Sequence, residues 1–126
     1  MRYPIRFDAF SRVALLVLGA TPANSYVEVT DDIVKVSFGL YHRNFPRSEV
    51  TRATPGPGYW LTRGWRWRPG AIGMIASGGG VVSIHFRERM SLPLLPPMPV
   101  PTTRVERIDI TVEDPGALIA EIGAGG

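Results

Sequence analysis

The fold of this chain is decided by residues 107–123, which read RIDITVEDPGALIAEIG. At the start of this stretch, Ile108, Ile110 and Val112 alternate with polar side chains. The polar residues are Arg107, Asp109, Thr111 and Glu113. Alternation with a period of two is typical of a β-strand with one apolar and one solvent-facing side. We therefore expect a strand with one wet face over residues 107–113.

The residues that follow change to the pattern of a short helix. Asp114 has a side-chain oxygen that can accept an N-cap hydrogen bond, and Pro115 at the first helical position loses no hydrogen bond. Gly123 suits the end of the helix, because glycine adopts a left-handed conformation without strain. A strand that leads directly into a terminal helix predicts a helical lid on a sheet. It indicates an architecture and no activity.

Length and composition favour one domain without cysteine chemistry. The chain has 126 residues, of which 44% are hydrophobic, enough for a core of its own. It has no cysteine, which excludes disulfides, thiolate nucleophiles and cysteine-based metal sites. A reducing compartment is permitted, and we expect a cytoplasmic protein. Thirteen arginines stand against the single Lys35, a bias that suggests a GC-rich coding sequence and a bacterial origin.

Charge is distributed unevenly, although the net charge is only +3. Residues 1–39 are neutral overall, residues 40–90 carry eight basic against two acidic side chains, and residues 91–126 carry two against five. The middle of the chain is therefore its basic part. Such a patch can meet an acidic protein, a phospholipid surface or nucleic acid, and it can equally be a solvated arginine-rich face.

Residues 1–22 are expected to form an N-terminal segment ahead of the main domain at 23–126. The only long apolar run, 13–18, has six residues, far fewer than the roughly 20 that cross a bilayer. We expect a short amphipathic helix over residues 8–18 that packs on the main domain. A helix at a membrane interface is the alternative, so membrane association stays open.

The main domain begins with strand patterns. Residues 27–29 and 34–38 alternate on either side of the polar turn Asp31-Asp32, which predicts a hairpin. A further strand leads to Pro46, which has no N–H for a central ladder and so predicts an edge strand or a strand start.

Residues 71–76 and 81–87 predict a second hairpin around the glycines at 78–80. Residues 91–101 contain five prolines and predict an extended loop before the final strand. The total is about seven strands, mostly antiparallel because their connections are short. A small β chain must protect its sheet edges, and a barrel or two orthogonal sheets with a helix over one end achieves this.

Five short stretches carry a resemblance to a known family. They are YVEV at 26–29, VSFG at 36–39, FPRSEV at 45–50, GVVSI at 80–84 and VEDP at 112–115. In this order they resemble the pleckstrin-homology-like (PH-like) superfamily, especially uncharacterised bacterial members of actinobacterial type. The resemblance implies a mainly β fold: a seven-stranded antiparallel PH-like barrel of two near-orthogonal sheets with a C-terminal capping helix. It also implies a domain that binds phosphoinositides, peptides or proteins and is not an enzyme.

The first hairpin argues against one of these ligands. Lipid-binding members of the family carry clustered basic residues there, whereas this chain has only Lys35 beside Glu28, Asp31 and Asp32. Specific phosphoinositide binding is therefore disfavoured.

The strongest functional candidate is a segment that we call the Trp/Arg region. Its residues are Trp60, Arg63, Trp65, Arg66, Trp67 and Arg68. Tryptophan offers stacking area, and arginine offers cation–π contacts and forked donors for carboxylate or phosphate. We expect a surface for a protein partner or an anionic membrane, without specific nucleic-acid binding, because no RNA- or DNA-binding motif accompanies it. The alternative is that Trp65 and Trp67 point into the core and the arginines face water.

The remaining polar motifs have structural explanations. His42 and His85 are the only histidines, too few for a typical zinc site, and His85 alternates with apolar neighbours as an outward-facing residue. Asp31 and Asp32 suit a turn, and the glycines at 78–80 lack the Gly-Lys-Ser/Thr of a phosphate-binding loop. We therefore predict no catalytic residue, no metal site and no cofactor.

Three functions remain open. The first, which we favour, is a non-enzymatic binding or scaffold domain that uses the Trp/Arg region. The second is a self-assembling module, a homo-oligomer held together by strand edges and tryptophans. The third is a small β-barrel that holds an apolar ligand or acts as an enzyme, which needs a large internal cavity with convergent polar groups.

Overall fold

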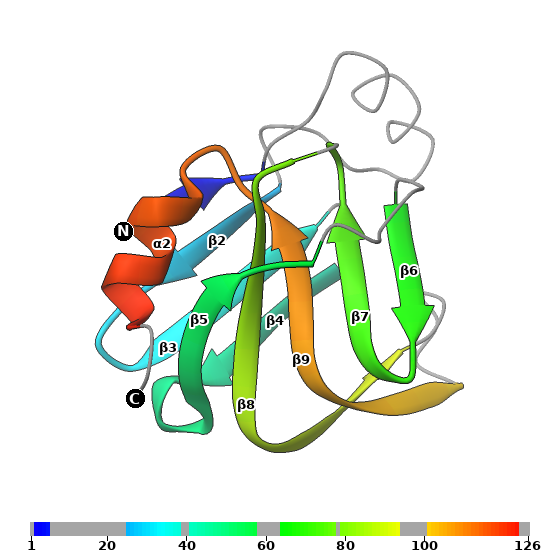
Figure 1. Ribbon diagram of the computed structural model, residues 1–126. Helices are drawn as coiled ribbons and strands as arrows, with labels where there is room; N and C mark the ends of the chain where they lie inside the picture. The colour runs from blue at the N-terminus through cyan, green and yellow to red at the C-terminus, as the bar shows by residue number, and fades with distance from the viewer. Residues whose placement is uncertain are drawn as a thin grey trace.

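The computed structural model describes these parts of the chain: residues 2–5, 25–38, 41–57, 64–77, 79–93 and 101–123. They form two β-sheets and a C-terminal helix (Figure 1). The expectation of a mainly β fold with a terminal helix is therefore confirmed. Within these ranges, no helix is both long and apolar enough to span a bilayer.

The first sheet has four antiparallel strands in the order β1-β2-β3-β4. They are β1 (Arg2–Pro4), β2 (Tyr26–Val29), β3 (Ile33–Phe38) and β4 (Tyr41–Pro46). The predicted hairpin of β2 and β3 is confirmed, and the Thr30 hydroxyl closes its turn by accepting from the backbone N–H groups of Asp32 and Ile33. Pro46 ends β4, which is an edge strand as predicted.

The second sheet has five strands in the order β5-β8-β9-β7-β6. They are β5 (Val50–Pro55), β6 (Gly64–Arg68), β7 (Gly70–Ile75), β8 (Val81–Pro93) and β9 (Thr102–Thr111). The 3-10 turn η2 (Arg47–Glu49) leads from the first sheet into β5. Neighbouring strands are antiparallel except for β7 and β9, which are parallel.

The position of β9 corrects two expectations. The hairpin predicted for residues 71–76 and 81–87 is wrong, because β9 lies between β7 and β8 and pairs with both. The strands are mostly antiparallel, as expected, although β7 and β9 are parallel, and the described residues form nine strands where about seven were expected. Residues 108–111 of β9 are all fully buried, so this strand is covered on both faces, as is usual for strands that pair in parallel.

Asp109 and Thr111 also overturn the expected wet face of this strand, since both are fully buried. A buried polar side chain is costly unless it is hydrogen-bonded. Asp109 accepts from the Ser83 hydroxyl at 2.5 Å and from Arg107 Nε at 3.2 Å. Thr111 Oγ1 accepts from the backbone N–H of Ala76 at 3.0 Å. These bonds compensate for the lost hydration of the two side chains.

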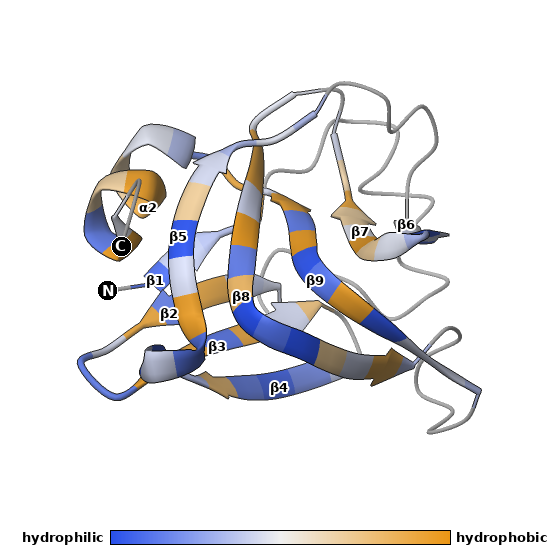
Figure 2. Cartoon of the chain, turned by 60° about the horizontal axis from the view of Figure 1, so that its bottom comes forward, coloured by the Kyte–Doolittle hydropathy of each residue, from blue (hydrophilic) through white to orange (hydrophobic). Residues whose placement is uncertain are grey.

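The hydrophobic core lies between the two sheets. Strands of the first sheet pass obliquely behind those of the second in Figure 1, and Figure 2 shows apolar and polar residues alternating along β8 and β9. The rings of Phe45 on β4 and Phe86 on β8 lie 4.8 Å apart and join the two layers. An isolated bridge from Ile5 to Val112 connects the sheets at one corner. Closure into a barrel goes beyond this bridge and stays a prediction.

The helix α2 (Pro115–Ile122) has the boundaries that the sequence predicted. Asp114 caps it by accepting from the Ala117 N–H at 3.1 Å, and Gly123 ends it with a φ of 102°. Leu118 is the fully buried residue of the helix and packs into the core. The helix therefore covers one side of the two-sheet stack, as expected for a lid (Figure 1).

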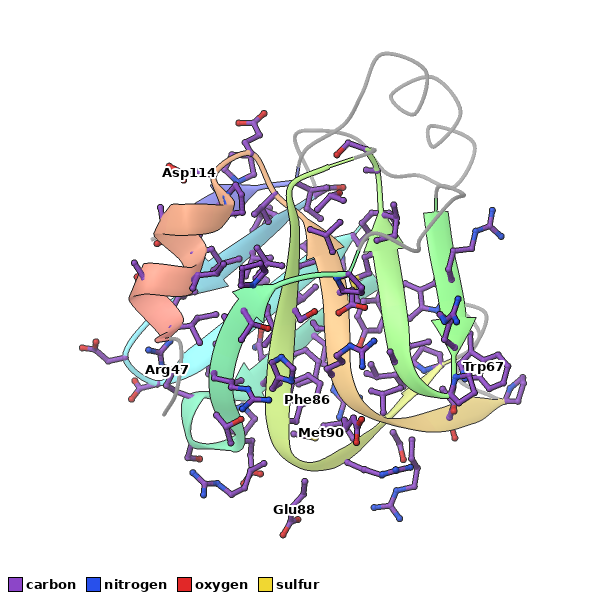
Figure 3. All side chains as sticks on the ribbon, viewed as in Figure 1. Arg47, Trp67, Phe86, Glu88, Met90 and Asp114 are labelled. Carbon is purple, nitrogen blue, oxygen red and sulfur yellow. The ribbon has the colours of Figure 1, made fainter. Side chains whose placement is uncertain are left out.

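Polar contacts hold α2 against both sheets. The Tyr3 hydroxyl donates to the Glu121 carboxylate at 2.6 Å, and burial together with this bond raises the pKa of Tyr3 to about 12. Arg47, at the C-terminal end of α2 in Figure 3, donates from Nη2 to the Glu121 carbonyl at 2.9 Å. The backbone N–H of Ala53 donates to the Gly123 carbonyl at 2.8 Å. A cation at this end of a helix also interacts favourably with the helix dipole.

Two predictions concern segments that the structure describes only in part. The N-terminal helix expected over residues 8–18 lies outside the described residues, whereas the nearby β1 is a strand that was not predicted. The proline-rich loop expected over residues 91–101 is shorter at its N-terminal end, since β8 continues to Pro93, and β9 begins at Thr102, directly after the expected end of the loop. Residues 94–100 lie outside the described residues.

Candidate functional site

The structure divides the Trp/Arg region. Trp60 and Arg63 lie outside the described residues. The other four side chains follow one another along β6: Trp65, Arg66, Trp67 and Arg68. Successive residues of a strand point to opposite faces, so the tryptophans lie on the core side of the sheet and the arginines on its outer side. Tryptophans and arginines of β6 therefore do not form one continuous surface.

The two tryptophans of β6 differ in environment. Trp65 is half-buried, packs edge-on against Tyr41 with 4.7 Å between ring centroids, and donates from Nε1 to the Pro93 carbonyl at 3.1 Å. Trp67 is 51% exposed and donates from Nε1 to Thr103 Oγ1 at 3.1 Å. Figure 3 places Trp67 at the edge of the molecule away from α2. Trp65 therefore belongs to the core, and Trp67 stays accessible.

The outer side of the second sheet carries a row of basic residues. Arg52 of β5 is opposite His85 of β8, which is opposite Arg107 of β9. Arg107 is opposite Ala71 of β7, which is opposite Arg68 of β6. Residues that are directly opposite one another share one face of a sheet. With Arg66, one row away, they form what we call the basic face: Arg52, Arg66, Arg68, His85 and Arg107.

His85 is the titratable residue in the middle of this row. It is half-buried, whereas Arg52 and Arg68 are exposed. Burial lowers the pKa of His85, and Arg52 and then Arg107 lower it further, which favours the neutral imidazole. Its Nε2 lies 2.9 Å from Thr54 Oγ1. With the Thr54 hydroxyl as donor, Nδ1 carries the proton and can donate to a ligand.

Arg107 is held in place by a buried carboxylate. Its Nε donates to Asp109 Oδ1 at 3.2 Å, and the same oxygen accepts from Ser83 at 2.5 Å. The Arg107 side chain is 23% exposed, while Asp109 has no exposure. Charge-assisted bonds of this kind are short and directional. The guanidinium of Arg107 is therefore fixed on the basic face before any ligand arrives.

A pocket of about 520 Å³ opens at one end of the basic face. Its lining residues are Thr51, Arg52, His85, Phe86, Glu106 and Arg107. This volume is within the range of small-molecule sites. Two other pockets lie beside α2, and neither has more than one basic side chain among its described lining residues. Of these three pockets, which the described residues line, the one at the basic face is best suited to an anion.

The basic face provides donors and positive charge, and the described residues provide no arrangement for a metal. They contain no group of three or more His, Asp or Glu side chains placed to hold a metal ion. His42 lies on the first sheet, where its Nδ1 is 2.8 Å from Ser37 Oγ, and His85 lies on the second. The geometry fits binding of a ligand through hydrogen bonds and charge.

The basic face contains three residues that the sequence reasoning did not include: Arg52, His85 and Arg107. The outward position of His85 was recognised from its alternation with apolar neighbours. Its proximity to the two arginines depends on pairing between strands that are far apart in sequence. A signal for the site exists only in the combination of alternation and register.

No protein-family model, curated protein or solved structure matches this chain. The resemblance to the PH-like superfamily therefore stays a prediction from short sequence stretches. What the chain binds has to be inferred from the geometry of the basic face.

Proposed function

We propose that this chain is a non-enzymatic binding domain that uses its basic face to meet an acidic segment of a partner protein. The observation that carries the proposal is the row of Arg52, His85, Arg107 and Arg68 on one side of the second sheet. Arg52 and Arg107 lie on either side of His85, and Arg68 lies further along the same row, so this face concentrates positive charge that an anionic partner can neutralise. The PH-like barrel belongs to the same proposal, since PH-like domains as a class bind proteins and peptides.

A protein partner is favoured over a membrane by the position of the exposed aromatic side chain. Proteins at a membrane interface combine basic residues with an apolar or aromatic anchor. Among the described residues, Trp67 is the exposed large apolar one, and strand alternation places it on the side of β6 opposite Arg66 and Arg68. The described part of the basic face offers charge without an aromatic anchor.

Charge reversal at Arg68 tests the proposal, with poly-glutamate as the acidic probe. We expect Arg68→Glu to weaken binding of the peptide by about ten-fold at low salt, because a carboxylate then replaces the cation at one end of the basic row. Lys35→Glu is the matched control, since it makes the same change of charge on the first sheet. It should change the affinity by less than about two-fold. Isothermal titration calorimetry on the full chain measures both.

Two results would decide against the proposal. Equal weakening by Arg68→Glu and Lys35→Glu would mean that the peptide responds to net charge alone. Binding to phosphatidylserine vesicles that depends on Arg68 and exceeds binding to poly-glutamate would make a membrane the anionic partner.

A second candidate function, self-assembly, is favoured by the edge strand β6. Among the strands that the structure describes, β6 is the last of the second sheet, and it carries the exposed Trp67. An edge strand can pair with another chain through its unpaired backbone groups. Light scattering that gives a monomer over a wide concentration range would end this candidate. A barrel around an apolar ligand gains no support from the core, where buried side chains such as Phe45, Ile84 and Ile110 occupy the space between the sheets.

A further inference from the structure

The second sheet bends where three of its strand pairs are irregular (Figure 1). Thr51 is an extra residue of β5 against β8, and Glu106 is an extra residue of β9 against β7. Between β8 and β9 the register breaks after His85 and resumes at Met90. Figure 3 shows Phe86 and Met90 along this bend. Bulges redirect side chains and are common beside binding sites.

The pocket on the basic face lies at this bend, and both bulged residues, Thr51 and Glu106, line it. Arg52 also lines it, and the Arg52 side chain has no hydrogen bond or ion pair with any residue that the structure describes. Arg107 contributes a second guanidinium, fixed by Asp109. The pocket therefore combines one uncompensated cation with one that is already oriented.

We propose that this pocket binds a phosphate group between Arg52 and Arg107, with His85 as a further hydrogen-bond donor. A phosphate carries more charge and more acceptor oxygens than a carboxylate, so it can satisfy two guanidinium groups and an imidazole together. The inference rests on the proposed function and deepens it, because it names the chemical group that the basic face holds at its pocket.

The pocket lining also contains one carboxylate, that of Glu106, which repels an anion only weakly. Glu106 Oε2 lies 3.9 Å from Arg89 Nη2, and both side chains are more than half exposed. Water and the neighbouring guanidinium screen such a charge. Because Glu106 and Asp109 each have an arginine partner, Arg52 supplies the excess positive charge.

His85 reports whether the pocket is occupied. It faces Arg52 from β5, and Arg107, Glu106 and Asp109 from β9. Burial and the two arginines lower its pKa below the ordinary value of 6.5. A bound phosphate favours the protonated imidazole, so the pKa of His85 rises when the pocket fills.

NMR titration of the full chain with inorganic phosphate at constant ionic strength tests the inference. We expect saturable shifts of the His85 ring at millimolar phosphate, together with a raised His85 pKa. Arg52→Ala should weaken phosphate binding by about ten-fold or more. This variant should fold normally, because Arg52 is exposed. Arg104→Ala is the matched control, since it removes an exposed arginine of β9 that belongs neither to the basic face nor to the pocket lining, and it should change the affinity by less than about two-fold.

Several outcomes overturn the inference. One is a His85 ring that shows no saturable response to phosphate, or the same response to chloride at equal ionic strength. Another is equal weakening by Arg52→Ala and Arg104→Ala, which means that phosphate responds to the net charge of the protein and not to the pocket. If inorganic phosphate does not bind to the pocket while poly-glutamate still binds through Arg68, the pocket inference is lost and the proposed function stands. If phosphate binds and poly-glutamate does not, the pocket inference stands and the proposed function is lost.

A second arm separates free phosphate from phosphate on a partner. A short peptide with one phosphoserine is compared with inorganic phosphate and with the same peptide lacking the phosphate. Tighter binding of the phosphopeptide than of inorganic phosphate assigns the pocket to a phosphorylated side chain, and equal binding assigns it to the free ion. Both results support a phosphate site. Equal binding of the two peptides contradicts it.

Discussion

The two sides of β9 differ in what they require from their neighbours. Ile108 and Ile110 face the core, where any close-packed apolar neighbour stabilises them. Arg107 and Asp109 face the outer side, where each needs a particular donor or acceptor at hydrogen-bond distance. The apolar side is therefore specified by composition, and the outer side by strand register. The residues of the apolar side are therefore easier to predict from a sequence than the contacts of the outer side.

Ile108→Ala tests the core side and should have the largest effect on stability. Ile108 is fully buried, so the change loses transfer free energy and leaves a cavity. We expect the free energy of unfolding to fall by about 4 kcal/mol. Chemical denaturation followed by tryptophan fluorescence measures it. Ile33→Ala, at a half-buried position of β3, is the control, and an equal loss in both variants would contradict the central position of Ile108.

Asp109→Ala tests the outer side and should be nearly as costly, although the residue is polar. The change removes the buried carboxylate oxygen that accepts from both the Ser83 hydroxyl and the Arg107 guanidinium. We expect a loss of about 3 kcal/mol in the free energy of unfolding. Asp32→Ala, in the exposed turn between β2 and β3, should cost only about 0.5 kcal/mol. If Asp109→Ala lowers the free energy of unfolding only slightly, the hydrogen bonds that strand register places on the outer side contribute little to stability.

Thr111→Val keeps the shape of the side chain and removes its oxygen. The backbone N–H of Ala76 then loses its acceptor in a buried position. We expect a loss of about 1–2 kcal/mol in the same denaturation experiment. Thr102→Val, at an exposed position of the same strand, should have almost no effect. If Thr111→Val does not change the free energy of unfolding, the hydrogen bond from the Ala76 N–H to Thr111 does not contribute to stability.

The pH dependence of His85 should give the smallest effect. The pKa of His85 is lowered in the folded chain, so the unfolded chain binds the proton more readily. The contribution to stability is complete above the ordinary pKa and is lost as the pH falls through the lowered pKa. The wild type should therefore lose more stability on acidification than His85→Gln. Identical pH profiles for the two proteins would mean that the environment of His85 does not favour its neutral form.

Elements defined by neighbouring residues were predictable from the sequence. Helix α2 begins after Asp114 and ends at Gly123, because caps act within a few residues. The hairpin of β2 and β3 is equally local. The arrangement of β7, β8 and β9 is not local: the glycine-rich connection at 78–80 resembles a hairpin turn, yet a strand with two buried faces lies between its arms.

The candidate site was predictable only in part, for the same reason. Arg66 and Arg68 belong to a dense segment and were included. Arg52, His85 and Arg107 are single residues whose proximity depends on the pairing of three strands. The tryptophans of β6 were grouped with the arginines because they are neighbours in sequence, and strand alternation then separates them.

The central place of β9 also determines when the second sheet can be completed during synthesis. Residues 102–111 form the middle of this sheet, although they are made after its other four strands. Until they emerge from the ribosome, β6 and β7 form a two-stranded unit, and two strands alone are marginally stable in water. Sheets that rely on pairing between distant segments fold slowly. A chain stopped before residue 102 would expose two apolar strand edges, which makes unfinished copies prone to aggregation.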